Sequence, residues 1–372
     1  MLDLILGIRW VNLMKNYIMR CSTMKEVAIL THYDLSVFRG GEKFVINLAN
    51  ALAGDGFKVT IYSLPFKRGV TNPKKFLSKH VKYISSFSFR KVDADIAYYI
   101  YAPLVYRFFF RDSSNKKIAG LHGYVITPEL SSRELWNLSF PRFLMTHGMK
   151  ATLAHYYLKI SKKEELTNFN IIHVINPFTS LPPYLRKKAV YAPLWTEYKR
   201  TFPVDKEKEE KFSVLMLGTS SYLKGKDICH IILSFFSKVK EGHEMIFRSN
   251  AYIRHSMVQS LGFISEEKMP HLLSRSHVVL YPSRLDTFGM TIIESLNCGT
   301  PVITSDILAH RLFREPVYLC SSLSDYINAL IHLYNMWKDG LYEIVRIKAL
   351  KEGSKFTKAK VFPLYRRIIY DC

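Results

Sequence analysis

The chain has 372 residues, 48% of them hydrophobic and 14% aromatic, which is too much for one ordinary core and enough for two. Its formal net charge of +22 predicts attraction to anionic lipid, nucleic acid or phosphorylated substrates. Five scattered cysteines without metal-ligand spacing argue against a disulfide framework and a zinc site, and favour a reduced, cytoplasmic protein.

The first 23 residues are apolar and basic, and their structural status is open. Their apolar core is too short for a membrane span, and they lack the small-residue cleavage site of a secretory signal. They either form a basic amphipathic helix on a membrane surface or precede a translation start at Met24. The second interpretation is preferred.

A strand, helix, strand unit follows. Residues 27–30 and 59–62 are predicted strands, residues 38–41 a loop, and residues 42–53 an amphipathic helix. A right-handed crossover makes the two strands parallel. The unit lacks G-x-G-x-x-G, so a nicotinamide dinucleotide is not expected.

Residues 65–91 hold eight Lys or Arg and no acid, interleaved with aromatic residues. This pattern suits an anionic membrane interface, at about 1 kcal/mol per basic group, and also single-stranded nucleic acid. A solvated charged face over a core helix is an equal alternative. The basic side chains are those of Lys67, Arg68, Lys74, Lys75, Lys79, Lys82, Arg90 and Lys91.

The rest of the first half contains further strands. Residues 96–110 predict a buried strand and an adjoining helix, broken by Pro103. Residues 117–124 predict a strand that ends at His122, and residues 170–175 another. A lone histidine after a strand is more often structural than functional.

A charged segment with a proline, residues 196–211, is the predicted linker. We expect an amino-terminal domain over 24–195 and a second domain over 212–355. The second opens with a strand, a turn at Gly218 and a helix from about Asp227. Lys224 lies in that strand-to-helix loop, where a mobile point charge suits a phosphate.

Residues 277–306 form a second strand, loop, helix, strand pattern, with the helix from Met290 to Gly299. Open α/β sheets bind ligands at such a loop, and the amides of the helix start suit an anion. Gly289 lets the backbone come close to a ligand. Asp286 and Glu294 are eight positions apart, and their carboxylates suit the hydroxyls of a sugar and a ribose better than a phosphate. Singly, each acid would be explained as a turn former or a helix-surface residue.

The string PS-x-x-D-x-F-G-x-x-x-x-E-S-x-x-C-G-T-P-V resembles the signature of the retaining glycosyltransferases of family four, the glycosyl transferases group 1. The resemblance implies an α/β fold of the GT-B type, with two Rossmann-like domains facing across a cleft. It places the acceptor in the first domain and the nucleotide sugar in the second, and residues 356–372 in a helix that returns to the first. Two positions depart from the family: Asp286 stands where Glu is usual, and Thr219 where Arg is usual.

The resemblance also assigns roles residue by residue. His122 positions the transferred sugar, Asp286 holds its hydroxyls, and Lys224 contacts the phosphates; these three form the predicted catalytic set. Backbone atoms of Phe263 and Ile264 contact the base, and Glu294 the ribose. The remaining donor-binding predictions are Gly41, Gly218, Gly225, Phe288, Gly289, Met290 and Thr291.

The implied reaction moves a sugar from a nucleotide diphosphate sugar to a hydroxyl with retained configuration, without a metal or another cofactor. The acceptor, a lipid or a glycan, and a peripheral position on the membrane are left open. Two alternatives also stay open. One is a degenerate protein that binds nucleotide sugar, anionic membrane or nucleic acid without turnover, and the other is a glycosyltransferase that modifies nucleic acid.

Overall fold

The computed structural model describes residues 25–370 except 38, 66–68, 70 and 199–210. The leader, Lys67, Arg68, the Arg90 side chain and most of the predicted linker therefore lie outside the described residues. The described chain divides into two compact units. The first holds the residues up to Ile118 except Tyr101–Leu104, and the second holds that short segment and the residues from Ala119 onward. The domain boundaries expected from the sequence stay a prediction.

The first unit contains the expected β-α-β element. Strands β1 (Glu26–Thr31) and β2 (Lys58–Ser63) pair in parallel, and α2 (Gly40–Gly54) connects them. Every residue of β5 (Ile96–Ile100) is buried, as its apolar sequence predicts. The other elements of this unit are η1 (Leu35–Val37), η2 (Pro73–Phe76), β3 (Val81–Ser85), β4 (Phe89–Val92), α3 (Val105–Phe109) and β6 (Phe110–Asp112).

One local prediction is wrong. Residues 38–41 were expected to be a loop, but α2 already begins at Gly40. The reason is the side chain of Glu42, which accepts a hydrogen bond from the Arg39 amide at 3.1 Å and satisfies the helix start. A Cβ on Gly41 would lie 2.6 Å from the Tyr33 ring, so a larger residue at this position requires that ring to shift.

Strand β7 (Lys116–Leu121) continues from the first unit into the second. The first sheet has the order β3-β2-β1-β5-β7-β8-β9, with β8 at Ile171–Val174 and β9 at Ala189–Tyr191. Between β7 and β9 the chain forms η3 (Pro128–Leu130), η4 (Arg133–Leu135), α4 (Phe140–His147), α5 (Met149–Ser161), η5 (Glu164–Asn168) and α6 (Pro183–Arg186).

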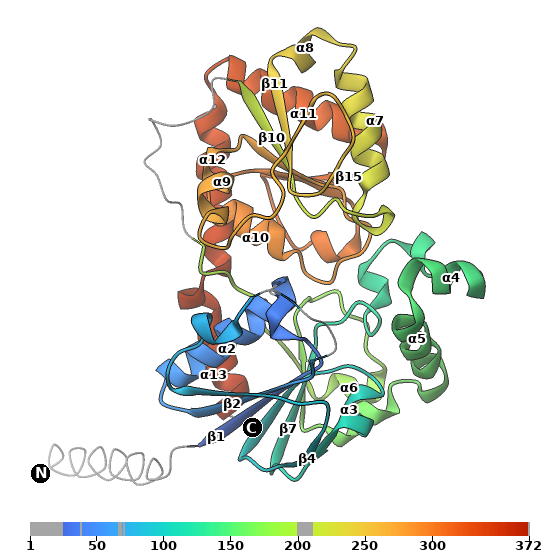
Figure 1. The fold of residues 1–372 in the computed structure, drawn as a ribbon, viewed down its shortest axis with the longest axis vertical. Helices are drawn as coiled ribbons and strands as arrows, with labels where there is room; N and C mark the ends of the chain where they lie inside the picture. Colours follow the sequence, from blue (N-terminus) through green and yellow to red (C-terminus); the bar gives the residue numbers. More distant parts are fainter. Residues whose placement is uncertain (1–24, 38, 66–68, 70, 199–210, 371–372) are drawn as a thin grey trace, which may run out of the picture. The chain divides into compact units, whose positions relative to one another are not determined.

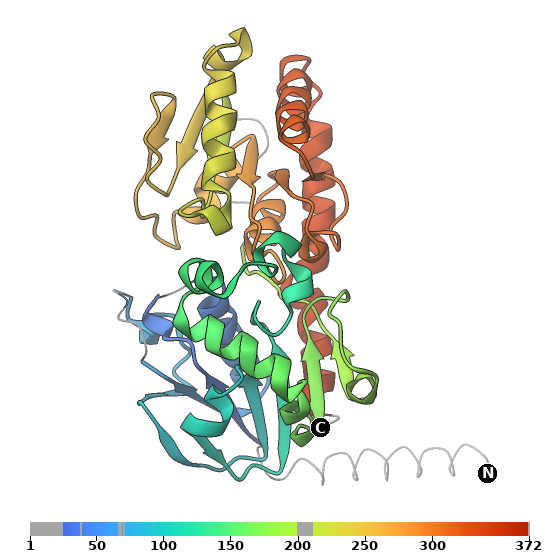
Figure 2. The ribbon, with the colours of Figure 1, turned by 90° about the vertical axis from the view of Figure 1, so that its right-hand side faces the viewer.

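The second sheet is parallel throughout, in the order β12-β11-β10-β13-β14-β15. Helices lie on both sides of it (Figures 1 and 2). Its strands are β10 (Phe212–Met216), β11 (Met245–Ser249), β12 (Val258–Ser260), β13 (Val278–Tyr281), β14 (Val302–Ser305) and β15 (Val317–Cys320). The helices are η6 (Tyr222–Lys224), α7 (Lys226–Phe236), α8 (Lys240–His243), α9 (Met269–Arg275), α10 (Met290–Asn297), η7 (Leu308–His310), α11 (Leu323–Lys338) and α12 (Tyr342–Gly353).

The chain ends with η8 (Ser354–Phe356) and α13 (Lys358–Tyr370). The Tyr365 hydroxyl donates a hydrogen bond to the carbonyl of Pro193 at 3.0 Å, and its ring lies 4.9 Å from that of His173. The terminal helix therefore packs against β8 and the residues that follow β9.

Candidate functional site

The loop between β13 and α10 forms the centre of the candidate site. The strand ends at Tyr281, and Gly289 precedes the helix with φ of +101°. A Cβ on Gly289 would lie 2.9 Å from the end of the Ile292 side chain, and the backbone angle itself favours glycine. The first amides of α10 thus follow a tight turn, as expected for an anion-binding helix start.

Asp286 is held inside this loop. Its Oδ2 accepts a hydrogen bond from the Tyr281 hydroxyl at 2.8 Å and lies 3.3 Å from Nε2 of His310. Its Oδ1 accepts from the amide of Thr287 at 2.8 Å and, more weakly, from that of Phe288 at 3.4 Å. Its side chain is 15% exposed. Burial alone would raise the pKa of Asp286, but Lys224, His310 and Tyr281 together hold it well below its usual range, so the carboxylate is ionised.

Lys224 reaches the same loop from η6. Its Nζ donates to the Leu285 carbonyl at 2.8 Å and to the Tyr281 hydroxyl at 3.2 Å. Burial lowers the pKa of Lys224, but Tyr281 and Asp286 outweigh it and raise the pKa above its ordinary value. The phenol of Tyr281 thus joins the two predicted charges, and burial raises its own pKa to about 12.

Two members of this network were missed from the sequence. Tyr281 closes an apolar strand and looked like a core residue. His310 lies 24 positions after Asp286 and is fully buried; its Nδ1 lies 2.9 Å from Thr304 Oγ1. The turn from β14 into η7 places His310 beside Asp286, and the sequence contains no signal for this contact.

His122 also reaches this loop, through its backbone. It follows β7 directly and is buried, and its carbonyl accepts a hydrogen bond from Thr287 Oγ1 at 3.1 Å. Asn176 and Ser131 add to the contact: Nδ2 of Asn176 donates to the Ala309 carbonyl at 3.0 Å, and Ser131 Oγ donates to the Asp286 carbonyl at 3.0 Å. The structure therefore brings together the backbone of His122, the Asp286 loop and Lys224.

Glu294 lies one turn into α10 and is buried. Burial, together with the charges of Glu294 and Glu266, raises the pKa of the Tyr198 phenol well above its usual range. Tyr198 Oη donates a hydrogen bond to the Glu266 carboxylate. A tyrosine and a second acid therefore accompany the predicted ribose ligand.

The glycine turn after β10 has the expected backbone. Gly218 and Gly225 have φ of +67° and +74°, and a Cβ on Gly225 would lie 2.1 Å from the carbonyl oxygen of Pro282. Thr219 is fully buried, and among the described residues its Oγ1 has no hydrogen-bond partner. Its short side chain does not supply the cation that Arg would bring.

Other predicted donor-binding residues differ in exposure. The Phe263 side chain is 84% exposed, and Ile264 is half-buried. The Phe288 ring is buried, and it packs edge-on against the rings of Phe313 and Phe356. The Phe288 side chain therefore packs beneath the loop, and only the backbone of Phe288 is left to contact a ligand. Gly41 belongs to the first unit.

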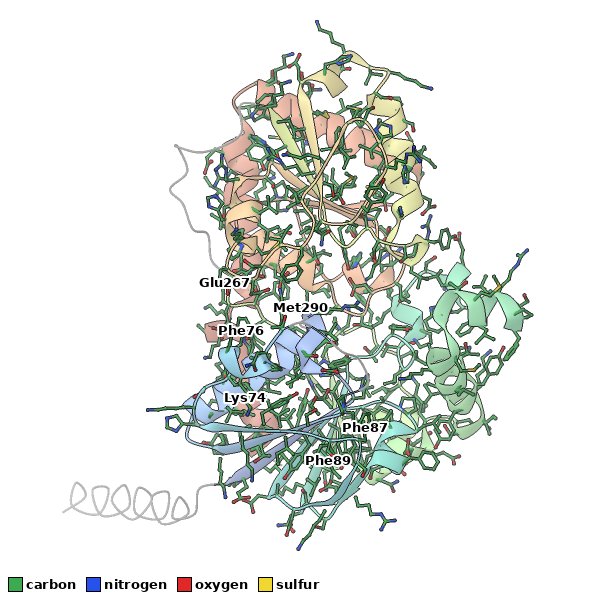
Figure 3. All side chains as sticks on the ribbon, in the orientation of Figure 1. Lys74, Phe76, Phe87, Phe89, Glu267 and Met290 are labelled. Carbon is green, nitrogen blue, oxygen red and sulfur yellow. The ribbon has the colours of Figure 1, made fainter. Side chains whose placement is uncertain are left out.

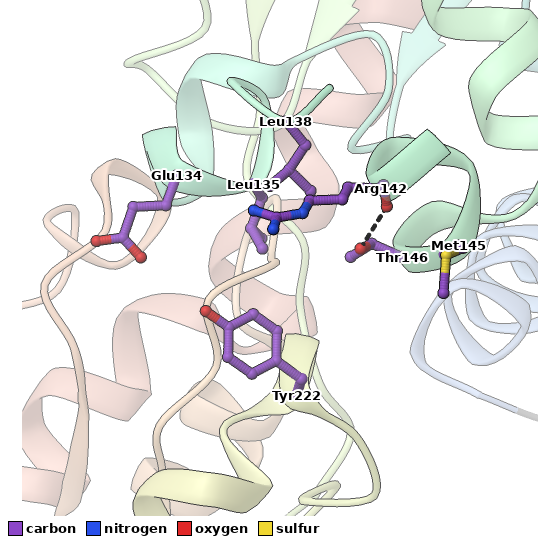
Figure 4. Close-up of a pocket in the computed structure, with 7 residues that line it drawn as sticks. All are labelled: Glu134, Leu135, Leu138, Arg142, Met145, Thr146 and Tyr222. Carbon is purple, nitrogen blue, oxygen red and sulfur yellow. Dashed lines mark hydrogen bonds between the residues drawn. The ribbon is translucent and has the colours of Figure 1, made fainter. Parts of the chain in front are cut away.

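The described residues of the second unit line, among others, the following two pockets. One, of about 220 Å³, is mostly apolar and lies beside α4 (Figure 4); it is lined by Glu134, Leu135, Leu138, Arg142, Met145, Thr146 and Tyr222. The other, of about 380 Å³, includes Ser132, Asp227, Arg284, Asp306 and Tyr326. Arg284 donates to both carboxylate oxygens of Asp227 at 2.7 Å, and its guanidinium lies 4.2 Å from the Tyr222 ring centre. This arginine is therefore engaged within the protein.

Within the described residues, the basic segment contains a 3-10 turn and strands. It lies against helix α2, where Asn50 donates a hydrogen bond to the Phe76 carbonyl at 2.7 Å and accepts one from the Ser78 amide at 2.8 Å. Its cations Lys74, Lys75, Lys79, Lys82 and Lys91 are exposed. Phe76 is half-buried and Phe89 is buried, whereas Phe87 is 67% exposed (Figure 3). The described part of the segment therefore presents its cations to solvent together with the ring of Phe87.

Within the described residues, no group of three or more His, Cys, Asp or Glu is placed to hold a metal ion. In the same part of the chain, no helix has the length and apolarity needed to cross a membrane.

The part of the chain that contains most of the second sheet is similar in sequence to a known protein family. Residues 202–311 match the family described as glycosyl transferases group 1, which confirms the resemblance drawn from the motif. A segment of 105 residues is 26% identical to the O-antigen chain mannosyltransferase B of Escherichia coli, and covers 28% of this chain and 28% of that protein. A segment of 67 residues is 39% identical to the O-antigen biosynthesis glycosyltransferase WclY of Escherichia coli, and covers 18% of each. The matches thus span less than a third of these relatives.

Solved structures match over nearly the whole chain. The Alr3699/HepE protein of Anabaena, solved in complex with UDP and glucose, has a TM-score of 0.66 at 14% identity and covers 94% of this chain and 100% of that one. WaaG, a glycosyltransferase involved in lipopolysaccharide biosynthesis, has a TM-score of 0.62 at 13% identity, with 92% and 99% covered. Sucrose-phosphate synthase of Thermosynechococcus elongatus has a TM-score of 0.65 at 15% identity, with 94% and 100% covered. These likenesses confirm the predicted GT-B fold.

Proposed function

Since residues 202–311 match the glycosyl transferases group 1 and the chain has the GT-B fold, we propose that it is a retaining glycosyltransferase. It transfers a sugar from a nucleotide diphosphate sugar to a hydroxyl acceptor. One observation carries the proposal: an ionised Asp286 and a charged Lys224 share the Tyr281 hydroxyl, in the loop that leads to the first amides of α10. The carboxylate of Asp286, which accepts hydrogen bonds from sugar hydroxyls, and the ammonium of Lys224, which contacts the phosphates, are thus adjacent in this proposal.

Each group of the loop has a role in this proposal. Lys224 and the amides of Gly289, Met290 and Thr291 stabilise the charge that grows on the leaving diphosphate. The exposed side of the Asp286 carboxylate accepts a hydrogen bond from a hydroxyl of the sugar. That hydroxyl competes with the Phe288 amide, the weaker of the present donors to Asp286. Glu294 holds the ribose.

The bond between the anomeric carbon and the diphosphate oxygen breaks as the acceptor oxygen attacks from the same face. The acceptor proton passes to the leaving phosphate, so no protein nucleophile takes part. His122 positions the sugar, and the reaction needs no metal. Two observations support a nucleotide sugar as donor: a similar structure was solved with UDP and glucose, and one relative is named a mannosyltransferase.

The acceptor is a glycan or a lipid-linked molecule in this proposal, and the protein works at the membrane surface. The exposed cations of residues 74–91 supply long-range attraction to anionic lipid. Nucleic acid is the less favoured partner of the same cations.

A second candidate function is binding of the nucleotide sugar without turnover. Thr219 favours it, because a buried threonine replaces a cation that would contact the diphosphate.

A panel of UDP-, GDP- and ADP-sugars tests both candidates, with binding and slow hydrolysis measured for the wild type and for Lys224→Ala. The matched control is Lys226→Ala, in the first turn of α7. Hydrolysis of one donor that is lost in Lys224→Ala alone supports the transferase. Saturable binding without hydrolysis, in the presence of candidate acceptors, supports the binding protein, and absence of any binding contradicts both.

A further inference from the structure

Helices α4 and α5 follow one another as a hairpin (Figures 1 and 2). Residues of α4 line the 220 Å³ pocket (Figure 4). Gly148 joins the two helices with φ of +79°, a backbone angle that favours glycine. The inner side of the hairpin is packed: the Phe143 ring stacks on those of His147 and His155, at 4.2 Å and 4.7 Å. Leu158 is buried on the same side. These contacts hold the hairpin in place and define which side faces outward.

The outward side of α5 carries a stripe of large apolar residues. Met149, Leu153, Tyr156 and Ile160 follow one another at intervals of four, three and four, which places them on one helix face. They are 59%, 55%, 36% and 83% exposed. Phe140 of α4 is 54% exposed, and its ring lies 5.5 Å from that of Tyr156. We call these five residues the outer stripe. A contiguous exposed stripe of this kind marks an interaction surface.

The charge within α4, α5 and the residues next to them has one sign. Residues 139–163 contain five Lys or Arg and no Asp or Glu, and the first acids after them are Glu164 and Glu165. Arg142, Lys150, Lys159 and Lys162 are exposed, and Lys159 Nζ lies 5.2 Å from the centre of the Tyr156 ring. The surface therefore combines apolar side chains with cations that reach the same face.

We propose that the outer stripe docks on an anionic lipid bilayer, with α5 lying in the plane of the interface. Its apolar side chains enter the boundary between headgroups and acyl chains, and the neighbouring cations meet the anionic headgroups. A second copy of the chain fits less well, because it would bring the same cations together in an interface.

This surface differs from the basic segment at residues 74–91. There the cations and the ring of Phe87 are exposed, but Phe89 is buried and Phe76 half-buried, so the described residues offer one large exposed ring and not a stripe. The outer stripe offers five large apolar side chains for insertion into the bilayer. Because Arg142 and Met145 of α4 also line the 220 Å³ pocket, docking would bring the rim of that pocket close to the lipid. The docking itself does not depend on sugar transfer.

The test is co-sedimentation of the full chain with vesicles of phosphatidylcholine that contain about one third phosphatidylglycerol. The variant is Met149→Ser, Leu153→Ser and Ile160→Ser combined, which keeps the charge. The matched control is Ile344→Ser with Ile347→Ser, two apolar residues of α12 that are 51% and 59% exposed. We expect the partition coefficient to fall at least tenfold in the stripe variant and less than twofold in the control.

Insertion has its own readout. In Leu153→Trp, the new indole should be quenched by brominated acyl chains, and in Ile344→Trp it should not. Circular dichroism and donor hydrolysis, which the stripe should not affect, show that the variants are folded and separate this proposal from the proposed function.

Three results would overturn the proposal. The first is that the folded stripe variant partitions onto the vesicles as strongly as the wild type. The others are that the indole at position 153 is not quenched, or that the wild type binds equally well to vesicles of phosphatidylcholine alone. A stripe-dependent dimer in light scattering without vesicle binding would assign the surface to a second copy instead. Stripe-dependent binding of single-stranded DNA or RNA without vesicle binding would assign it to nucleic acid.

Discussion

The Nε2 atom of His310 lies 3.3 Å from Oδ2 of Asp286, and its Nδ1 lies 2.9 Å from Oγ1 of Thr304. Thr304 Oγ1 donates its own proton to the Tyr281 carbonyl at 2.7 Å. It therefore accepts from His310, and both ring nitrogens face acceptors. His310 orients the carboxylate on which the proposed sugar contact depends.

His310→Ala should remove this donor, leave a cavity and cost about 2–4 kcal/mol of unfolding free energy. It should also raise the pKa of Asp286, because one of the groups that lower it is lost. Urea unfolding measures the first effect, and NMR titration of the Asp286 carboxyl the second. His332→Ala, which changes an exposed histidine of α11, is the control. An unchanged pKa of Asp286 in a destabilised variant would limit His310 to a structural role.

Tyr281→Phe should lower kcat/KM for the donor by about tenfold, because its hydroxyl serves Asp286 and Lys224 at once. Tyr365→Phe is a matched control, since it removes a buried hydroxyl that donates to the Pro193 carbonyl and lies outside the Asp286 loop. Both variants should lose about 1 kcal/mol of stability, but only Tyr281→Phe should lose activity. Equal activities would contradict the role of the shared hydroxyl.

Glu294→Ala should abolish donor binding, because the proposed ribose contact is lost. Isothermal titration with the nucleoside diphosphate of the preferred donor measures the effect. Glu343→Ala, on the surface of α12, serves as the control. Full affinity in Glu294→Ala would remove the ribose role.

Asp286→Glu should change the choice of sugar while the affinity for the free nucleotide stays within about threefold. The longer side chain moves the carboxylate away from Tyr281 and His310 and toward the sugar. Competition between donor sugars measures the preference. A large loss of affinity for the free nucleotide would contradict the assignment of Asp286 to the sugar.

His173 should make the protein less stable in mild acid. Burial, offset in part by a hydrogen bond to the Ala192 carbonyl, lowers the pKa of His173 from 6.5 to about 4. In the unfolded chain, the His173 imidazole binds a proton below about pH 6.5, whereas in the folded chain it does so only near pH 4. Unfolding free energy is therefore lost as the pH falls through this window, by about 3 kcal/mol in total. Urea unfolding of wild type and His173→Gln between pH 7 and pH 4 should show a smaller loss in the variant; equal slopes would contradict the assignment.

The main elements of the second sheet were predictable because their signals are local. The apolar run of β13, the glycine before α10 and the proline after it define a strand, a loop and a helix in 30 residues. Helix α12 was not predicted, because Ile344 and Ile347 point to solvent while Tyr342 and Val345 are buried, so its apolar residues do not mark one face. The α4–α5 hairpin was missed for the same reason: α5 is apolar on its buried and on its exposed side.

By itself, the sequence determined the α/β alternation, the loop that carries Asp286, and the basic character of the chain, because each depends on neighbours along the chain. Only the tertiary structure decided that Tyr281 joins Lys224 to Asp286, that His310 returns to the same carboxylate, and that the outer stripe is left uncovered. Those relationships join residues far apart in the chain, through distances of a few ångströms that sequence periodicity does not encode.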